Sequence, residues 1–104
     1  MNTIKEGNFK ITIGENSVEL NKMILSYGNK GIILRHSFVK NSNGVSTSTA
    51  VLMCLKNKDI FNITGLTLNK EDTIKVESNN LEISIKISKG SFKSIKIKEL
   101  KAIE

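Results

Sequence analysis

The 104-residue sequence contains no proline, no tryptophan and only one cysteine, Cys54. A single cysteine excludes a disulfide framework within the chain and fits a reducing compartment. Without proline, the turns have to be made by glycine, asparagine, aspartate and serine. The sequence also lacks paired zinc ligands, a calcium loop and a glycine-rich phosphate loop. We therefore expect no metal and no cofactor.

Long apolar runs are missing as well. The longest, from Ala50 to Leu55, is far too short to cross a membrane. The first ten residues are polar and of mixed charge, without the apolar segment of a signal peptide. We expect a single β domain spanning residues 1–104, located in the cytoplasm and without contact to a membrane.

Positive charge is abundant, but it comes almost entirely from lysine. The formal net charge is +6, and fifteen lysines stand beside one arginine, Arg35. Basic proteins often bind nucleic acid or acidic proteins. However, A/T-rich codons encode Lys, Ile and Asn, which together make up 42 of the 104 residues. An A/T-rich genome would explain the lysines without selection for binding, and a single arginine argues against recognition of bases.

What the sequence does contain is alternation of apolar and polar residues, which continues without a break from Leu81 to Ser88. This period places alternate side chains on opposite faces of a β-strand. Shorter runs with the same period recur between polar turns. They predict an all-β fold, either a small antiparallel β-sandwich or a partly open barrel, with little or no helix. About eight short strands are expected, at residues 9–13, 18–27, 32–39, 45–55, 60–68, 74–77, 81–87 and 92–98.

The pattern also predicts how some strands pair. The period slips between Leu20 and Met23, which indicates a β-bulge. Asn79-Asn80 suits a two-residue hairpin loop with positive φ angles. Such a loop would pair Val76 with Ile83, Ile74 with Ile85 and Ser78 with Leu81. In the last hairpin, a bulge near Lys93 is needed to keep the apolar face continuous, which would pair Ile85 with Ile95, Ile83 with Ile97 and Glu82 with Lys98.

Two groups of side chains resemble catalytic arrangements, but neither is complete. Glu77 and Glu82 become cross-strand neighbours in this register, yet lysines surround them and no third ligand is near. A turn at 40–44 would place His36, the only histidine, opposite Ser48. No acid is in place to orient this imidazole, and no Gly-x-Ser-x-Gly elbow exists. We expect a structural histidine at the rim of the core and a protein without enzymatic activity.

Two surfaces are candidates for binding a partner. The first is basic, and an acidic or phosphate-bearing partner would suit it, although lysines also protect sheet edges from aggregation. Its candidate residues are Lys86, Lys93, Lys96, Lys98 and Arg35. The second is a row of hydroxyls that could hydrogen-bond a sugar, a nucleotide or a peptide edge, or could be the solvated end of a long hairpin. It consists of Ser46, Thr47, Ser48 and Thr49.

These observations favour a non-catalytic β-protein that acts through protein–protein contacts or self-assembly, since exposed strand edges can pair with another protein. The composition fits a phage or mobile-element product, either structural or an inhibitor of a host system. Two alternatives remain open at this point. One is a basic OB-like barrel that binds single-stranded nucleic acid, and the other is a module that binds a small molecule or a sugar.

Overall fold

The computed structural model describes residues 3–37, 50–57, 63 and 66–100, and within these ranges the chain forms seven strands and no helix. The all-β prediction is therefore confirmed. Leu66–Leu68, which belong to an expected strand at 60–68, are described but lie outside any strand. The strands are β1 (Thr3–Ile13), β2 (Asn16–Gly28), β3 (Gly31–His36), β4 (Ala50–Leu55), β5 (Asp72–Ser78), β6 (Leu81–Ser88) and β7 (Ser91–Glu99).

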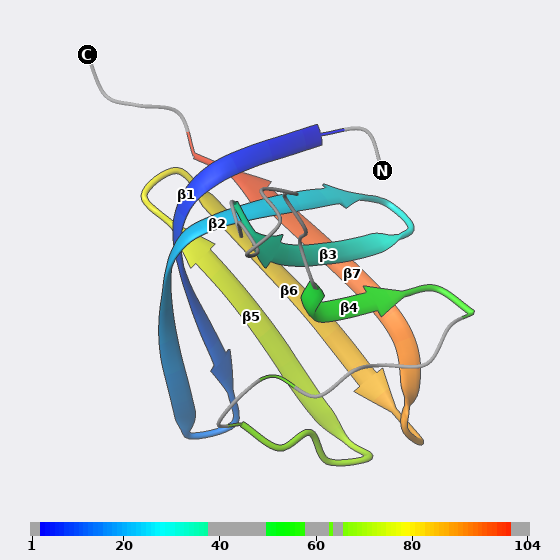
Figure 1. Ribbon diagram of the computed structural model, residues 1–104. Helices are drawn as coiled ribbons and strands as arrows, with labels where there is room; N and C mark the ends of the chain where they lie inside the picture. The colour runs from blue at the N-terminus through cyan, green and yellow to red at the C-terminus, as the bar shows by residue number, and fades with distance from the viewer. Residues whose placement is uncertain (1–2, 38–49, 58–62, 64–65, 101–104) are drawn as a thin grey trace, which may run out of the picture.

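All seven strands belong to one antiparallel sheet with the order β4-β3-β2-β1-β5-β6-β7. Strands that are neighbours in the sheet also follow one another in sequence, with the exception of β1 and β5. These two strands pair over only four residue pairs, from Lys10 opposite Glu77 to Ile13 opposite Ile74. Figure 1 shows β1 and β2 as long, strongly curved strands, so that the sheet bends and β3 and β4 lie across β6 and β7.

The inner face of the bent sheet forms one apolar core, to which every strand except β7 contributes fully buried or nearly buried side chains. Half-buried Phe92, Ile95 and Ile97 pack against this core from β7. Each fully buried isoleucine or leucine of the core contributes roughly 1.5–3 kcal/mol to stability. No polar or charged side chain is buried in the described part of the chain. The core residues are Phe9, Ile11, Ile13, Met23, Leu25, Tyr27, Ile32, Leu34, Leu52, Cys54, Ile63, Ile74, Val76, Leu81, Ile83, Ile85 and Ile87.

A β-bulge lies where β1 and β2 change direction. Gly7 pairs with Met23 and Phe9 with Leu20, so β2 carries one residue more than β1 between these pairs. The extra residue takes up a left-handed conformation at Lys22, with φ of 55°. Its backbone N–H donates to Oδ1 of Asn8 at 3.1 Å. The bulge predicted between Leu20 and Met23 is confirmed, and it strengthens the local twist of the sheet.

The predicted register of the C-terminal hairpins is also confirmed. Val76 pairs with Ile83 across the β5–β6 hairpin, and Ile85 pairs with Ile95 across the next one. The register shift in the β6–β7 ladder leaves Lys93 as the bulged residue. One detail was wrong, because neither residue of the Asn79-Asn80 loop has a positive φ.

The β3–β4 hairpin differs from its expected register. Leu34 pairs with Leu52, two residues away from the alignment that would place His36 opposite Ser48. A bulge after Leu34 then shifts the ladder by one residue. The apolar residues keep the same face in both alignments because a two-residue slip preserves the alternation. The hydrophobic pattern alone therefore could not distinguish the two registers.

A hydrogen bond joins β2 to β7, two strands that are not neighbours in the sheet. The Tyr27 hydroxyl at the end of β2 donates a hydrogen bond to Oε1 of Glu99, the last residue of β7. Burial, followed by the hydrogen bond and the negative charge of Glu99, raises the pKa of Tyr27 to about 12. In the described residues no helix is long and apolar enough to span a membrane.

Candidate interaction site

The candidate site lies where β1 separates from β5. The two strands are paired only from Lys10 onward, and the first half of β1 continues with β2 alone among the described strands. Two adjoining pockets of about 340 and 460 Å³ occupy the space between this half of β1 and the end of the β5–β6 hairpin. We call this space the β1 cleft. Its two pockets share the lining residues Asn8, Phe9, Ser78 and Asn79.

On the side of β1 that faces the β1 cleft, the backbone groups before Lys10 have no partner among the described strands. In an antiparallel ladder, successive residues direct their N–H and C=O groups alternately to opposite neighbours. Gly28 and Gly31 flank the two-residue turn between β2 and β3, so their backbone groups bond to each other. The preceding residue, Tyr27, therefore directs its backbone groups to β1, where it forms a hydrogen-bonded pair with Thr3. Glu6 therefore directs both backbone groups away from β2, and it lines the cleft.

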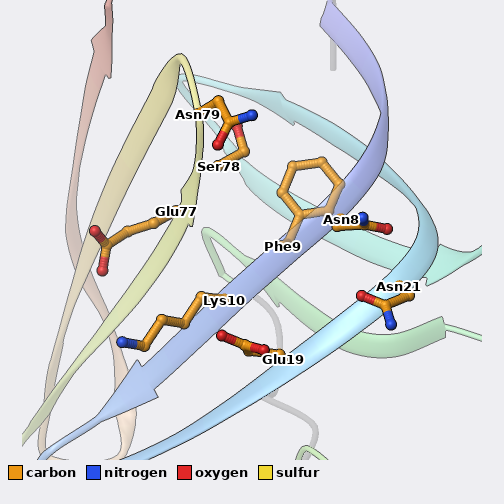
Figure 2. Close-up of a pocket in the computed structure, with 8 residues that line it drawn as sticks. All are labelled: Asn8, Phe9, Lys10, Glu19, Asn21, Glu77, Ser78 and Asn79. Atoms are coloured by element: carbon orange, nitrogen blue, oxygen red, sulfur yellow. The ribbon is translucent and has the colours of Figure 1, made fainter.

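The side chains around the β1 cleft are mostly polar. Figure 2 shows the Phe9 ring extending toward Ser78 and Asn79 at the end of the β5–β6 hairpin. At the other end, Lys10 is the cross-strand partner of both Glu19 on β2 and Glu77 on β5. Amide and hydroxyl groups can donate or accept hydrogen bonds. The cleft thus combines an exposed strand edge with adaptable polar side chains.

The expected basic surface is found on the opposite side of the sheet from the core, over β6 and β7. Lys86, Lys96 and Lys98 are exposed on the outer face, and the bulged Lys93 is exposed beside them. Ser84 lies opposite Lys96, and Ser94 lies opposite Lys86. We call the surface formed by these residues the lysine face.

Arg35 does not belong to the lysine face. It lies on β3, which β2, β1 and β5 separate from β6. Its cross-strand neighbour on β2 is Ile24. The Nε atom of Arg35 is buried, and none of the described residues is its hydrogen-bond partner. The sequence could not reveal this separation, because the sheet order depends on the β1–β5 pairing.

The remaining candidate residues have different outcomes. Glu77 and Glu82 are cross-strand neighbours as expected, and Glu82 forms an ion pair with Lys75 at 3.2 Å. His36 is exposed at the end of β3, at the rim of the sheet. The hydroxyl row Ser46, Thr47, Ser48 and Thr49 lies outside the described residues.

Sequence reasoning missed the β1 cleft entirely. Its lining residues come from β1, β2 and the β5–β6 loop, and they are brought together by one non-local strand pairing. The only local signal is Gly7, whose φ of 150° accompanies the bend of β1. A glycine inside a strand pattern often marks such a bend or a close backbone approach.

No group of three or more histidine, cysteine, aspartate or glutamate side chains in the described part of the chain could hold a metal ion. Comparisons of this chain with protein-family models, with curated proteins and with solved structures gave no match.

Proposed function

We propose that this protein is a non-catalytic interaction domain that binds an extended segment of a partner protein in the β1 cleft. The observation that carries the proposal is the edge of β1 with which no described strand pairs, beside two pockets. A partner segment would pair with this edge as an additional strand. Strand addition is a common mode of peptide recognition, because the exposed backbone groups supply the hydrogen bonds.

The shape of the cleft supports an extended ligand rather than a helical one. The edge runs along β1 from Lys5 to Phe9, and the tip of the β5–β6 hairpin forms the facing wall. An added strand needs about 4.8 Å of lateral space next to β1. Side chains of such a strand would alternate between the Phe9 side and the exposed side of the sheet, which gives a basis for sequence preference.

The charges at the two ends of the cleft provide a second basis for preference. Lys5 and Glu6 line one end, and Glu19, Glu77 and Lys10 line the other. Because both signs are present, charges on a partner segment would fix its direction and alignment more than they would raise its affinity. Asn8 and Asn79 lie between these ends and can bond either polar side chains or the backbone of the added strand.

The test uses a proline that removes one backbone donor from the cleft. In Glu6→Pro the lost N–H points into the cleft and makes no bond to β2, so a proline is tolerated there as at other strand edges. The matched control, Glu6→Ala, removes the same side chain and keeps the N–H. Peptides would be selected from a library of displayed linear sequences on the wild-type protein, and their affinities measured for all three proteins.

We expect Glu6→Ala to retain its affinity for the peptide and Glu6→Pro to lose at least tenfold in affinity, while both variants unfold cooperatively on heating. Hydrogen exchange should slow at the Glu6 amide of the wild-type protein when peptide is added. Equal binding to the alanine and proline variants, or unchanged exchange at Glu6, would refute strand addition. If instead the free protein forms a dimer that Glu6→Pro dissociates, the edge serves a second copy of this chain.

A further inference from the structure

We infer that the lysine face binds the phosphate backbone of double-stranded nucleic acid without regard to base sequence. This surface is independent of the β1 cleft. It uses the outer sides of β6 and β7, whereas the cleft lies between β1 and the β5–β6 loop. The inference therefore goes beyond the proposed function and can fail separately from it.

Positive charge outweighs negative charge on the lysine face. Lys75 and Glu82 form an ion pair. Glu82 is the acidic residue directly opposite Lys98, so its charge is already engaged by β5. Lys86 and Lys96 face serines across the ladder rather than acids. Positive charge is consequently concentrated toward β7, where a surface of one sign attracts a polyanion.

The cations of the lysine face are arranged in a line along β7. Lys96 and Lys98 are two residues apart on the same face of β7, which corresponds to about 6.8 Å along the strand. The bulge exposes Lys93 near the start of the same strand. Lys93, Lys96 and Lys98 therefore all extend from β7, which is the edge strand of the sheet. A row of cations along an extended strand matches a linear polyanion better than it matches a compact anion.

Serine hydroxyls lie beside two of the four lysines. Ser94 is the cross-strand neighbour of Lys86, and Ser84 is the neighbour of Lys96. A phosphate oxygen held by an ammonium group can accept a second hydrogen bond from the adjacent serine. Serine side chains are common partners of nucleic-acid phosphates. A glutamate-rich protein also offers a row of negative charges, so polyglutamate is measured as an alternative ligand.

The lysine face offers no exposed aromatic ring from β6 or β7. Phe92, the aromatic residue of these two strands, is half-buried and packs against the core. Proteins that bind single strands use exposed aromatic rings on which bases stack. The lysine face carries no arginine either, and lysine lacks the planar fork that suits bidentate recognition of guanine. These features favour a duplex, whose bases are stacked inside and whose phosphates remain available.

The experiment measures the anisotropy of a labelled DNA duplex against the full-length protein over a range of salt concentrations. If Lys93, Lys96 and Lys98 each neutralise one phosphate, the slope of log K against log salt should be about −2.7. This slope corresponds to roughly a 40-fold loss of affinity between 50 and 200 mM salt. Lys96→Gln should reduce the size of this slope by about 1, and it should weaken two unrelated duplexes equally.

Lys30→Gln is the matched control, because it removes the same charge from an exposed residue in the β2–β3 turn, on the other half of the sheet. It should leave the slope nearly unchanged. An equal effect of Lys30→Gln would overturn the assignment to the lysine face. The inference is also overturned if the duplex is not bound at low salt, if a single strand of the same sequence binds more tightly, or if polyglutamate binds more tightly at the same salt.

Discussion

The contact between Tyr27 and Glu99 predicts a specific alkaline titration. Tyr27 is 2% exposed, and burial is the largest cause that raises the pKa of its hydroxyl from 10.0 to about 12. The hydrogen bond to Glu99 and the negative charge of that carboxylate raise the pKa further, while a hydrogen bond with Thr3 lowers it. Raising the pH through this range is therefore a perturbation directed at the contact between β2 and β7.

The sign of the effect on stability follows from the two pKa values. In the unfolded chain the phenol loses its proton near pH 10, and in the folded protein near pH 12. The contribution of Tyr27 to the free energy of unfolding is thus fully present below pH 10 and is lost as the pH rises to 12. The difference corresponds to about 2.7 kcal/mol at most. We expect roughly 1–2 kcal/mol, because Glu99 is exposed and solvent screens its charge.

The assay is simple because Tyr27 is the only tyrosine and tryptophan is absent. The near-ultraviolet absorbance of the phenolate reports this one group, first in the folded protein and then in urea. Glu99→Gln should bring the folded-state pKa down toward 10.0, but not fully, since burial remains. Urea denaturation followed by circular dichroism gives the free energy of unfolding for the wild type and for Tyr27→Phe over the same pH range.

Both proteins contain the same fifteen lysines, so the difference between their stability curves isolates Tyr27. We expect Tyr27→Phe to be less stable than wild type by about 1 kcal/mol at pH 7, where the hydrogen bond is lost. This deficit should shrink and then vanish as the pH rises through 10 to 12. A phenol that titrates at pH 10 while the protein is folded, or a deficit that does not depend on pH, would refute the reasoning.

Three further predictions concern the strands and their turns. Lys89 and Gly90 have φ angles of 54° and 75°, and Lys89→Asn should raise the free energy of unfolding by roughly 0.5–1 kcal/mol in urea denaturation, because Asn-Gly suits a type I′ turn. Gly31→Ala should lower it by about 3 kcal/mol, since the added Cβ would lie 2.8 Å from Cα of Leu55. Cys54 is fully buried and its pKa is raised to about 11, so it should react with a thiol reagent only in urea.

The parts of the fold that could be predicted from the sequence are those fixed by short-range pattern and turn length. A two-residue loop at Asn79-Asn80 determines which residues of β5 and β6 face each other, and the apolar alternation then requires the bulge at Lys93. A one-residue slip would have moved isoleucines of β6 to the exposed side, and the short loop leaves little room for a two-residue slip.

The pairing of β1 with β5 could not be predicted in the same way. Ile11 and Val76 are 65 positions apart, and no turn between them sets their alignment. The β1 cleft exists only because this pairing stops at Lys10, so the cleft could not be predicted from the sequence either. The lysine face could be predicted, because its residues lie on two strands joined by one short hairpin. Arg35 was misplaced beside it, since its position depends on the order of the whole sheet.

The single β1–β5 junction also has a consequence for how the chain folds. Residues 3–57 and 72–99 each contain strands whose neighbours in the sheet are also neighbours in the sequence. Hairpins form in microseconds because they close short loops. The four pairs between β1 and β5 form only when a much longer segment of the chain is closed into a loop. This closure costs conformational entropy before any contact between the two strands stabilises it. We expect this docking of two preformed meanders to limit the folding rate, which makes Ile11, Ile13, Ile74 and Val76 the residues whose truncation should slow folding most.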